Sequence, residues 1–96
     1  MRVISKARLR EFWKIHPHAE RPLRDWYTSM KEGSWKNFVE LQMAFPKVDQ
    51  VGHHTVFNVG GNKYRLIAAI HYNTRRAFVR FVLTHHEYDL GKWKSD

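Results

Sequence analysis

The sequence predicts a single α+β domain in which an N-terminal strand and helices precede an antiparallel sheet and a short C-terminal helix. Apolar residues recur at helical spacing through residues 7–45, whereas β-branched and aromatic residues dominate from Val51 onward. A chain of 96 residues is also too short to build two separate cores. We therefore expect residues 1–96 to fold as one unit, with the helices packed on one face of the sheet.

The N-terminal half contains two amphipathic segments separated by a proline. Arg2–Ile4 is expected to form a short strand, followed by a helix that Ser5 caps and that ends at about His16. A second helix is expected from about Ala19 to Glu32. We interpret the apolar stripes of both helices as core: Leu9, Phe12, Trp13 and His16 in the first, and Leu23, Trp26, Tyr27 and Met30 in the second.

A third, shorter helix precedes the sheet. Asn37 followed by Glu40 has the spacing of a capping box, and Pro46 ends the segment. The next elements are predicted to form a three-stranded antiparallel meander with turns at residues 60–62 and 73–74. The expected strands are Thr55–Val59, Lys63–Tyr72 and Arg76–Thr84.

A second capping-box spacing follows the last strand. Thr84 and Glu87 are three residues apart, which predicts that Thr84 begins a final helix running through Tyr88 toward Trp93.

The charge of the chain narrows the classes of partner. Seventeen Lys and Arg against nine Asp and Glu give a formal net charge of +8, which favours polyanions such as RNA, DNA or ribosomes. An acidic protein partner also fits, and a solvated basic surface without a specific ligand explains the composition equally well.

Several kinds of chemistry are excluded. The chain has no cysteine, which excludes disulfides, Cys-ligated zinc and thiol nucleophiles. The seven histidines show no standard zinc spacing, so we expect neither a metal nor another cofactor. No apolar run near the N-terminus is long enough for a signal peptide or a membrane span, which predicts a soluble, cytoplasmic protein without a membrane partner.

Arginines occur within the predicted sheet. Strand alternation places Lys63 and Arg65 on the face opposite the apolar residues of their strand, and it places Arg80 on the corresponding face of the next strand. Arg65 and Arg80 are therefore expected to be near neighbours. Phosphate recognition and simple solvation of this face explain the arginines equally well.

His85 and Tyr88 are the candidate acid–base residues. They lie three apart, on one face of the first turn of the predicted C-terminal helix, where backbone N–H groups favour anions. RNA cleavage by a 2′-hydroxyl requires a base, an acid and stabilisation of charge on phosphorus, and these side chains and the arginines could divide those tasks. On spacing alone, structural roles for both residues are favoured over catalysis.

Two segments resemble the HigB family of toxins: VFNVGGNKYRL at residues 56–66 and THHEYD at residues 84–89, with Arg80 between them. The order and separation of the segments match the family, and the N-terminal plan of strand and helices is similar. The resemblance implies a RelE-like fold and ribosome-dependent cleavage of mRNA by 2′-hydroxyl attack. It also implies neutralisation by a helix-turn-helix antitoxin of the HigA type.

The resemblance implies roles for individual residues. Arg65 would contact RNA phosphate, Arg80 would stabilise the transition state, and His85 and Tyr88 would form the acid–base pair, with the assignment of acid and base open. Two further residues are candidates for RNA binding: Lys63 as a second cation and Asn62, which otherwise forms the turn.

Two other functions remain as alternatives. ParE-like toxins have a similar fold and inhibit DNA gyrase by binding, so the fold alone does not establish cleavage. A plain nucleic-acid-binding module would carry alternating aromatic and basic residues on an exposed sheet face, and only Phe78 between Arg76 and Arg80 fits that pattern.

Overall fold

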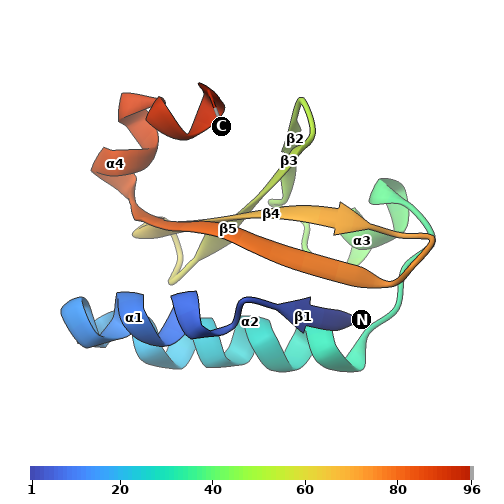
Figure 1. The fold of residues 1–96 in the computed structure, drawn as a ribbon, viewed down its shortest axis with the longest axis horizontal. Coiled ribbons are helices and arrows are strands. Elements are labelled where there is room, and N and C mark those ends of the chain that lie inside the picture. Colours follow the sequence, from blue (N-terminus) through green and yellow to red (C-terminus); the bar gives the residue numbers. More distant parts are fainter. Residues whose placement is uncertain (96) are drawn as a thin grey trace.

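A computed structural model describes residues 1–95 and confirms the expected α+β class (Figure 1). Five strands form one sheet in the order β1-β5-β4-β3-β2. The elements are β1 (Arg2–Ile4), α1 (Ala7–Ile15), the 3-10 helix η1 (Pro17–Ala19), α2 (Glu20–Glu32), α3 (Phe38–Ala44), β2 (Asp49–Val51), β3 (His54–Val59), β4 (Tyr64–His71), β5 (Arg76–Thr84), α4 (His85–Leu90) and the 3-10 helix η2 (Lys92–Ser95).

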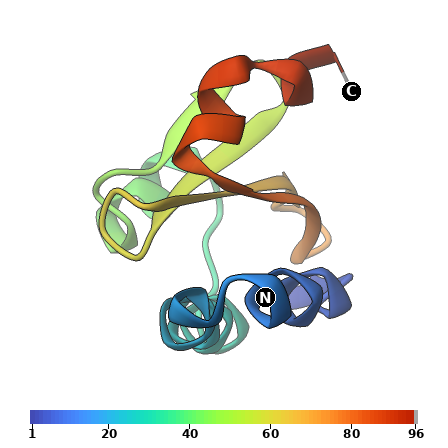
Figure 2. The ribbon, with the colours of Figure 1, turned by 90° about the vertical axis from the view of Figure 1, so that its left-hand side faces the viewer.

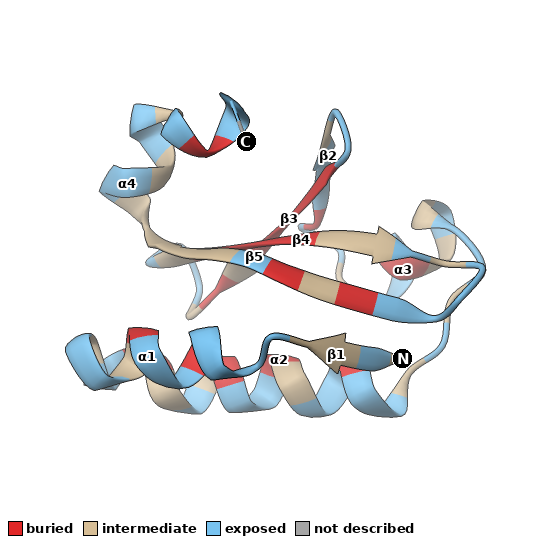
Figure 3. Ribbon diagram, viewed as in Figure 1, coloured by how far each residue is buried: buried red, intermediate tan, exposed pale blue. Residues whose placement is uncertain are grey.

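The sheet separates two layers of helices. Helices α1 and α2 lie side by side against one face, and α4 lies on the opposite side of the sheet (Figures 1 and 2). The larger apolar cluster joins the N-terminal helices to the sheet, and the inward sides of these elements are buried (Figure 3). A smaller cluster on the other face contains Val56, Ile67 and Trp93. The sheet therefore supports a separate C-terminal layer.

The sheet differs from the expected meander at both edges. The antiparallel pairing of β3, β4 and β5 is confirmed, but β1 pairs with β5 in parallel, so the sheet is mixed. The short edge strand β2 pairs with β3 and was not predicted. The parallel pair joins residues more than 70 positions apart, with Arg2 opposite Arg76, and local sequence patterns do not report such a contact.

A β-bulge changes the expected arrangement of the arginines. Ile67 pairs with Phe81 and Ala68 pairs with Val79, which leaves Arg80 as an extra residue. Beyond Val79, each side chain of β5 therefore lies on the opposite face from the one that simple alternation predicts. Phe81 accordingly packs in the smaller cluster, on the face opposite Val79. Arg65 pairs with Leu83, so the prediction that Arg65 and Arg80 are near neighbours across the strands is wrong.

The helix boundaries mostly follow the sequence predictions. Asn37 caps α3 by accepting a hydrogen bond from the Glu40 backbone N–H at 3.0 Å, as expected. The prediction that Ser5 caps α1 is wrong, because Ser5 has a positive φ of 71° and the helix begins at Ala7. The Ser5 carbonyl instead accepts from the Arg8 backbone N–H at 3.1 Å.

Tyr72 carries a buried hydroxyl next to the main core. Within residues 1–95 this oxygen has no hydrogen-bond partner, and burial raises the pKa of Tyr72 above its ordinary value of 10.0. Below pH 10 the neutral phenol is present in both the folded and the unfolded chain. As pH rises above that value, the unfolded chain loses the proton first, and the folded state loses stability.

Tyr72→Phe should therefore leave the free energy of unfolding at pH 7 unchanged or raise it by up to about 1 kcal/mol, because the substitution removes an unpaired polar group. It should also flatten the loss of stability above pH 10. Urea unfolding at pH 7 and at alkaline pH measures both effects. A clear loss of stability at pH 7 would show that the hydroxyl is hydrogen-bonded in solution.

Candidate active site

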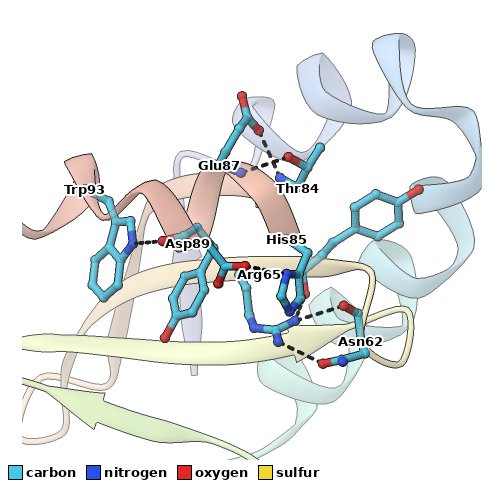
Figure 4. Close-up of polar contacts among 9 residues, drawn as sticks. Asn62, Arg65, Thr84, His85, Glu87, Asp89 and Trp93 are labelled. Atoms are coloured by element: carbon cyan, nitrogen blue, oxygen red, sulfur yellow. Dashed lines mark hydrogen bonds and ion pairs between the residues drawn. The ribbon is translucent and has the colours of Figure 1, made fainter.

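Helix α4 is fixed at both ends by its own sequence. The Glu87 backbone N–H donates to Thr84 Oγ1 at 3.2 Å, and the Thr84 backbone N–H donates to Glu87 Oε1 at 2.9 Å (Figure 4). This reciprocal pair confirms the predicted capping box. The helix ends at Gly91, whose φ of 73° lies in the left-handed region that glycine adopts readily. The short helix is thus fixed at both ends, directly after β5.

His85 lies at the first position of this helix. Its backbone N–H donates to the Lys63 carbonyl at 3.0 Å, which ties the helix start to the residue before β4. Its side-chain Nδ1 lies 2.9 Å from Asp89 Oδ2, one turn further along (Figure 4). The side chains of His85 and Asp89 are 45% and 58% exposed, so the pair is accessible to a ligand.

Arg65 on β4 is a buried cation, with only 8% of its surface exposed. Its guanidinium donates through Nη2 to Asn62 Oδ1 at 2.8 Å, and through Nη1 to the carbonyls of Tyr64 at 3.1 Å and Asn62 at 3.3 Å. Figure 4 shows Asn62 and Arg65 joined below α4. These bonds offset the cost of burying the charge. The predicted RNA-binding residue Asn62 thus shapes the turn and holds Arg65.

Tyr88 connects the buried arginine to the C-terminal segment. The Arg65 Cζ atom lies 5.2 Å from the centre of the Tyr88 ring, within the range of a cation–π contact. The same ring stacks on Trp93 with 5.1 Å between ring centres and 13° between planes. Trp93 is 3% exposed, and its Nε1–H donates to the Tyr88 carbonyl at 3.0 Å. His54 packs edge-on against Trp93.

The structure brings most of the predicted residues together. Four of them, Asn62, Lys63, Arg65 and Tyr88, are linked with His85 through the contacts above. The Lys63 side chain is exposed, as is that of Arg80 at the bulge. No hydrogen bond or ion pair within residues 1–95 joins Arg80 to this group. Arg80 thus remains a candidate phosphate contact outside this group.

Two residues gain importance only in the structure. Asp89 shares a helix face with His85, and their spacing of four residues is the signal for this contact. Trp93 was expected only to lie near the end of the last helix, and its fixation of Tyr88 has no local sequence signal. In the described part of the chain, no group of three or more His, Asp or Glu residues could hold a metal ion.

A family model described as the RelE-like toxic component of a toxin-antitoxin system, HigB_toxin, matches residues 19–91. The chain belongs to the HigB toxin family. The match contains both segments on which the resemblance was based and every residue of α4. The RelE-like architecture expected from the sequence is consistent with this family.

Two relatives cover almost the whole chain. The mRNA interferase HigB of Escherichia coli O6:H1 strain CFT073 is 35% identical over 92 residues, which are 93% of this chain and 89% of that protein. The mRNA interferase toxin HigB of Escherichia coli K12 is 30% identical over 93 residues, or 94% of this chain and 89% of that protein. The alternative of a ParE-like gyrase inhibitor gains no support from these relatives.

Among residues 1–95, the helices are too short or too polar to cross a bilayer.

Trp93 should be the main attachment of the C-terminal layer. Trp93→Ala should lower the free energy of unfolding by about 3 kcal/mol, or detach α4 locally, because it removes a buried aromatic ring. Trp93→Phe keeps the stacking surface and loses the donor to Tyr88, so it should cost only about 1 kcal/mol. Urea unfolding and hydrogen exchange of the amides at residues 85–91 measure the two effects.

Trp13 provides the matched control, since it is only partly buried, on the other side of the sheet. Trp13→Ala should leave exchange at residues 85–91 unchanged. Unaltered stability and unaltered exchange in Trp93→Ala would contradict the attachment.

Proposed function

We propose that the chain is an endoribonuclease toxin that cleaves mRNA, with His85 and Tyr88 as the acid–base pair. The observation that carries this proposal is the placement of both side chains on one capped helical turn above a buried arginine, in a member of the HigB toxin family. The relatives named mRNA interferase agree with this activity. A family of toxic components of toxin-antitoxin systems also implies an antitoxin partner.

The reaction begins with the 2′-hydroxyl of the nucleotide at the cut site. His85 takes its proton through Nε2, since Nδ1 faces Asp89 Oδ2 at 2.9 Å. The 2′-oxygen then forms a bond to phosphorus while the bond from phosphorus to the 5′-oxygen breaks. Tyr88 gives its phenolic proton to that departing oxygen. The products are a 2′,3′-cyclic phosphate and a 5′-hydroxyl, and solvent restores both protonation states.

Arg65 holds the proposed acid in place through the contact between its guanidinium and the Tyr88 ring, and it brings a positive charge close to that ring. Arg65 has already committed three hydrogen bonds to neighbouring backbone and side-chain oxygens, so its principal effect on RNA is through this charge.

Direct binding of RNA phosphate is assigned to exposed cations and not to Arg65. We assign contacts with RNA phosphate to Lys63, whose carbonyl accepts from the His85 backbone N–H, and to Arg80 at the bulge, because both side chains are exposed. Arg80 would stabilise the extra charge on phosphorus in the transition state. Asn62 acts mainly by holding Arg65, and its exposed position also allows contact with the RNA.

The ribosome is the proposed site of action, and the cytoplasm is the proposed location. A net charge of +8 favours association with ribosomal RNA, and mRNA is exposed there as an extended single strand. We further propose a helix-turn-helix antitoxin of the HigA type as the partner. The chemistry assigned to these residues requires no metal ion.

Programmed ribosomes provide the direct test. Purified protein should cut the bound mRNA to give a 2′,3′-cyclic phosphate, which end-group analysis detects. His85→Ala and Tyr88→Phe should each lower the single-turnover rate by about 10²- to 10⁴-fold, the range typical of general acid–base catalysis.

His86→Ala is the matched control, because this neighbouring histidine is exposed and forms no part of the pair. Its rate should equal that of the unmodified chain. Full activity in both His85→Ala and Tyr88→Phe would exclude the assignment, and a 3′-hydroxyl product would exclude the mechanism.

A further inference from the structure

Asp89 lies on α4, one turn after His85. Its Oδ2 atom is 2.9 Å from His85 Nδ1, and both side chains remain exposed. We infer that Asp89 is a positioning residue, which selects the tautomer and orientation in which His85 can act as the base. This inference rests on the proposed function and specifies the proton-accepting step.

The contact determines which ring nitrogen is available. A carboxylate oxygen can only accept a hydrogen bond, so the approach of Asp89 Oδ2 to 2.9 Å favours the ring form with a proton on Nδ1. In the neutral ring, Nε2 then holds the lone pair and is the nitrogen free to accept a proton from a 2′-hydroxyl. Once Nε2 is protonated, the carboxylate stabilises the resulting imidazolium. Both effects act on the base without any contact between Asp89 and RNA.

The helix fixes the backbone positions of both residues of this pair. His85 is tied to Lys63 through its backbone, and the capping box and Gly91 fix the turn on which both partners lie. The His85 side chain has no comparable packing, because almost half of its surface is exposed. Asp89 therefore supplies the restraint on the ring that packing does not.

An exposed ion pair on a helix contributes little to the free energy of unfolding. A large loss of activity without a loss of stability would therefore distinguish the proposed role from a structural one. The chain contains another such pair on α2, where Arg21 Nε lies 3.5 Å from Asp25 Oδ1. Asp25 is an exposed carboxylate at the same spacing of four residues, on the other side of the sheet from α4. It is the matched control for Asp89.

The experiment uses the full chain with Asp89→Ala, Asp89→Asn, Asp89→Glu and Asp25→Asn. On programmed ribosomes, Asp89→Ala should lower kcat at least about tenfold, with little change in KM, as expected for loss of an orienting partner. Asp89→Glu should recover part of the rate, and Asp89→Asn should lie between these variants. Asp25→Asn should behave as the unmodified chain.

Nitrogen-15 NMR of the His85 ring gives a readout that does not depend on activity. The unmodified chain should show mainly the neutral tautomer protonated at Nδ1, and Asp89→Ala should give a mixture of tautomers. His85→Gln identifies the signals among those of the seven histidines. The thermal unfolding midpoint should be nearly the same for all the variants.

The outcomes separate the inference from the proposed function. If the unmodified chain does not cleave RNA, the proposed function fails, and the inferred role in catalysis fails with it, whatever tautomer NMR shows. If it cleaves, an unchanged kcat in Asp89→Ala, a change confined to KM, or an unchanged tautomer would overturn the inference alone.

Discussion

The arrangement of the candidate active site depends on burying the positive charge of Arg65. A guanidinium removed from water must satisfy its donors. Here the turn before β4 supplies two oxygens of Asn62, and the first residue of β4 supplies the Tyr64 carbonyl. The ring of Tyr88 covers the same group from α4. The turn, the strand and the C-terminal helix are therefore coupled through one side chain. Their coupling gives His85 and Tyr88, the proposed acid–base pair, a charged and rigid support.

One face of the sheet provides most of the stability, and the other carries the candidate active site. The face covered by α1 and α2 holds most of the buried apolar residues, so it supplies most of the energy that folds the chain. The other face has a much smaller cluster around Trp93, which is sufficient to hold α4. Because α4 is short and capped by its own side chains, it holds the two proposed acid–base side chains at the edge of this cluster without requiring a deep cavity. Such an open site suits a strand of RNA held by a larger assembly.

The sequence predicted those features that depend on nearby residues. Both N-caps at Asn37 and Thr84 were found because the donor and the acceptor are three residues apart. The Ser5 cap failed because the residue type fits many turns and the backbone there is left-handed. The sequence did not reveal the bulge at Arg80, since apolar residues of β5 pack on both faces of the sheet. The parallel β1–β5 pairing and the contacts of Arg65 with Tyr88 join distant segments, so only the structure could reveal them. The resemblance to HigB toxins predicted the family, and the family match covers all of α4.

The central claim is that the substrate itself supplies the nucleophile, with the protein moving protons around it. The most direct measurement compares cleavage of two mRNAs that differ only at the nucleotide before the cut, one with a 2′-hydroxyl and one with a 2′-deoxyribose. The account predicts rapid cleavage of the first on programmed ribosomes and no cleavage of the second at that position, although both should compete equally for the protein. Cleavage of the 2′-deoxy strand at the same position and rate would contradict the account, since water or a protein group would then be the nucleophile.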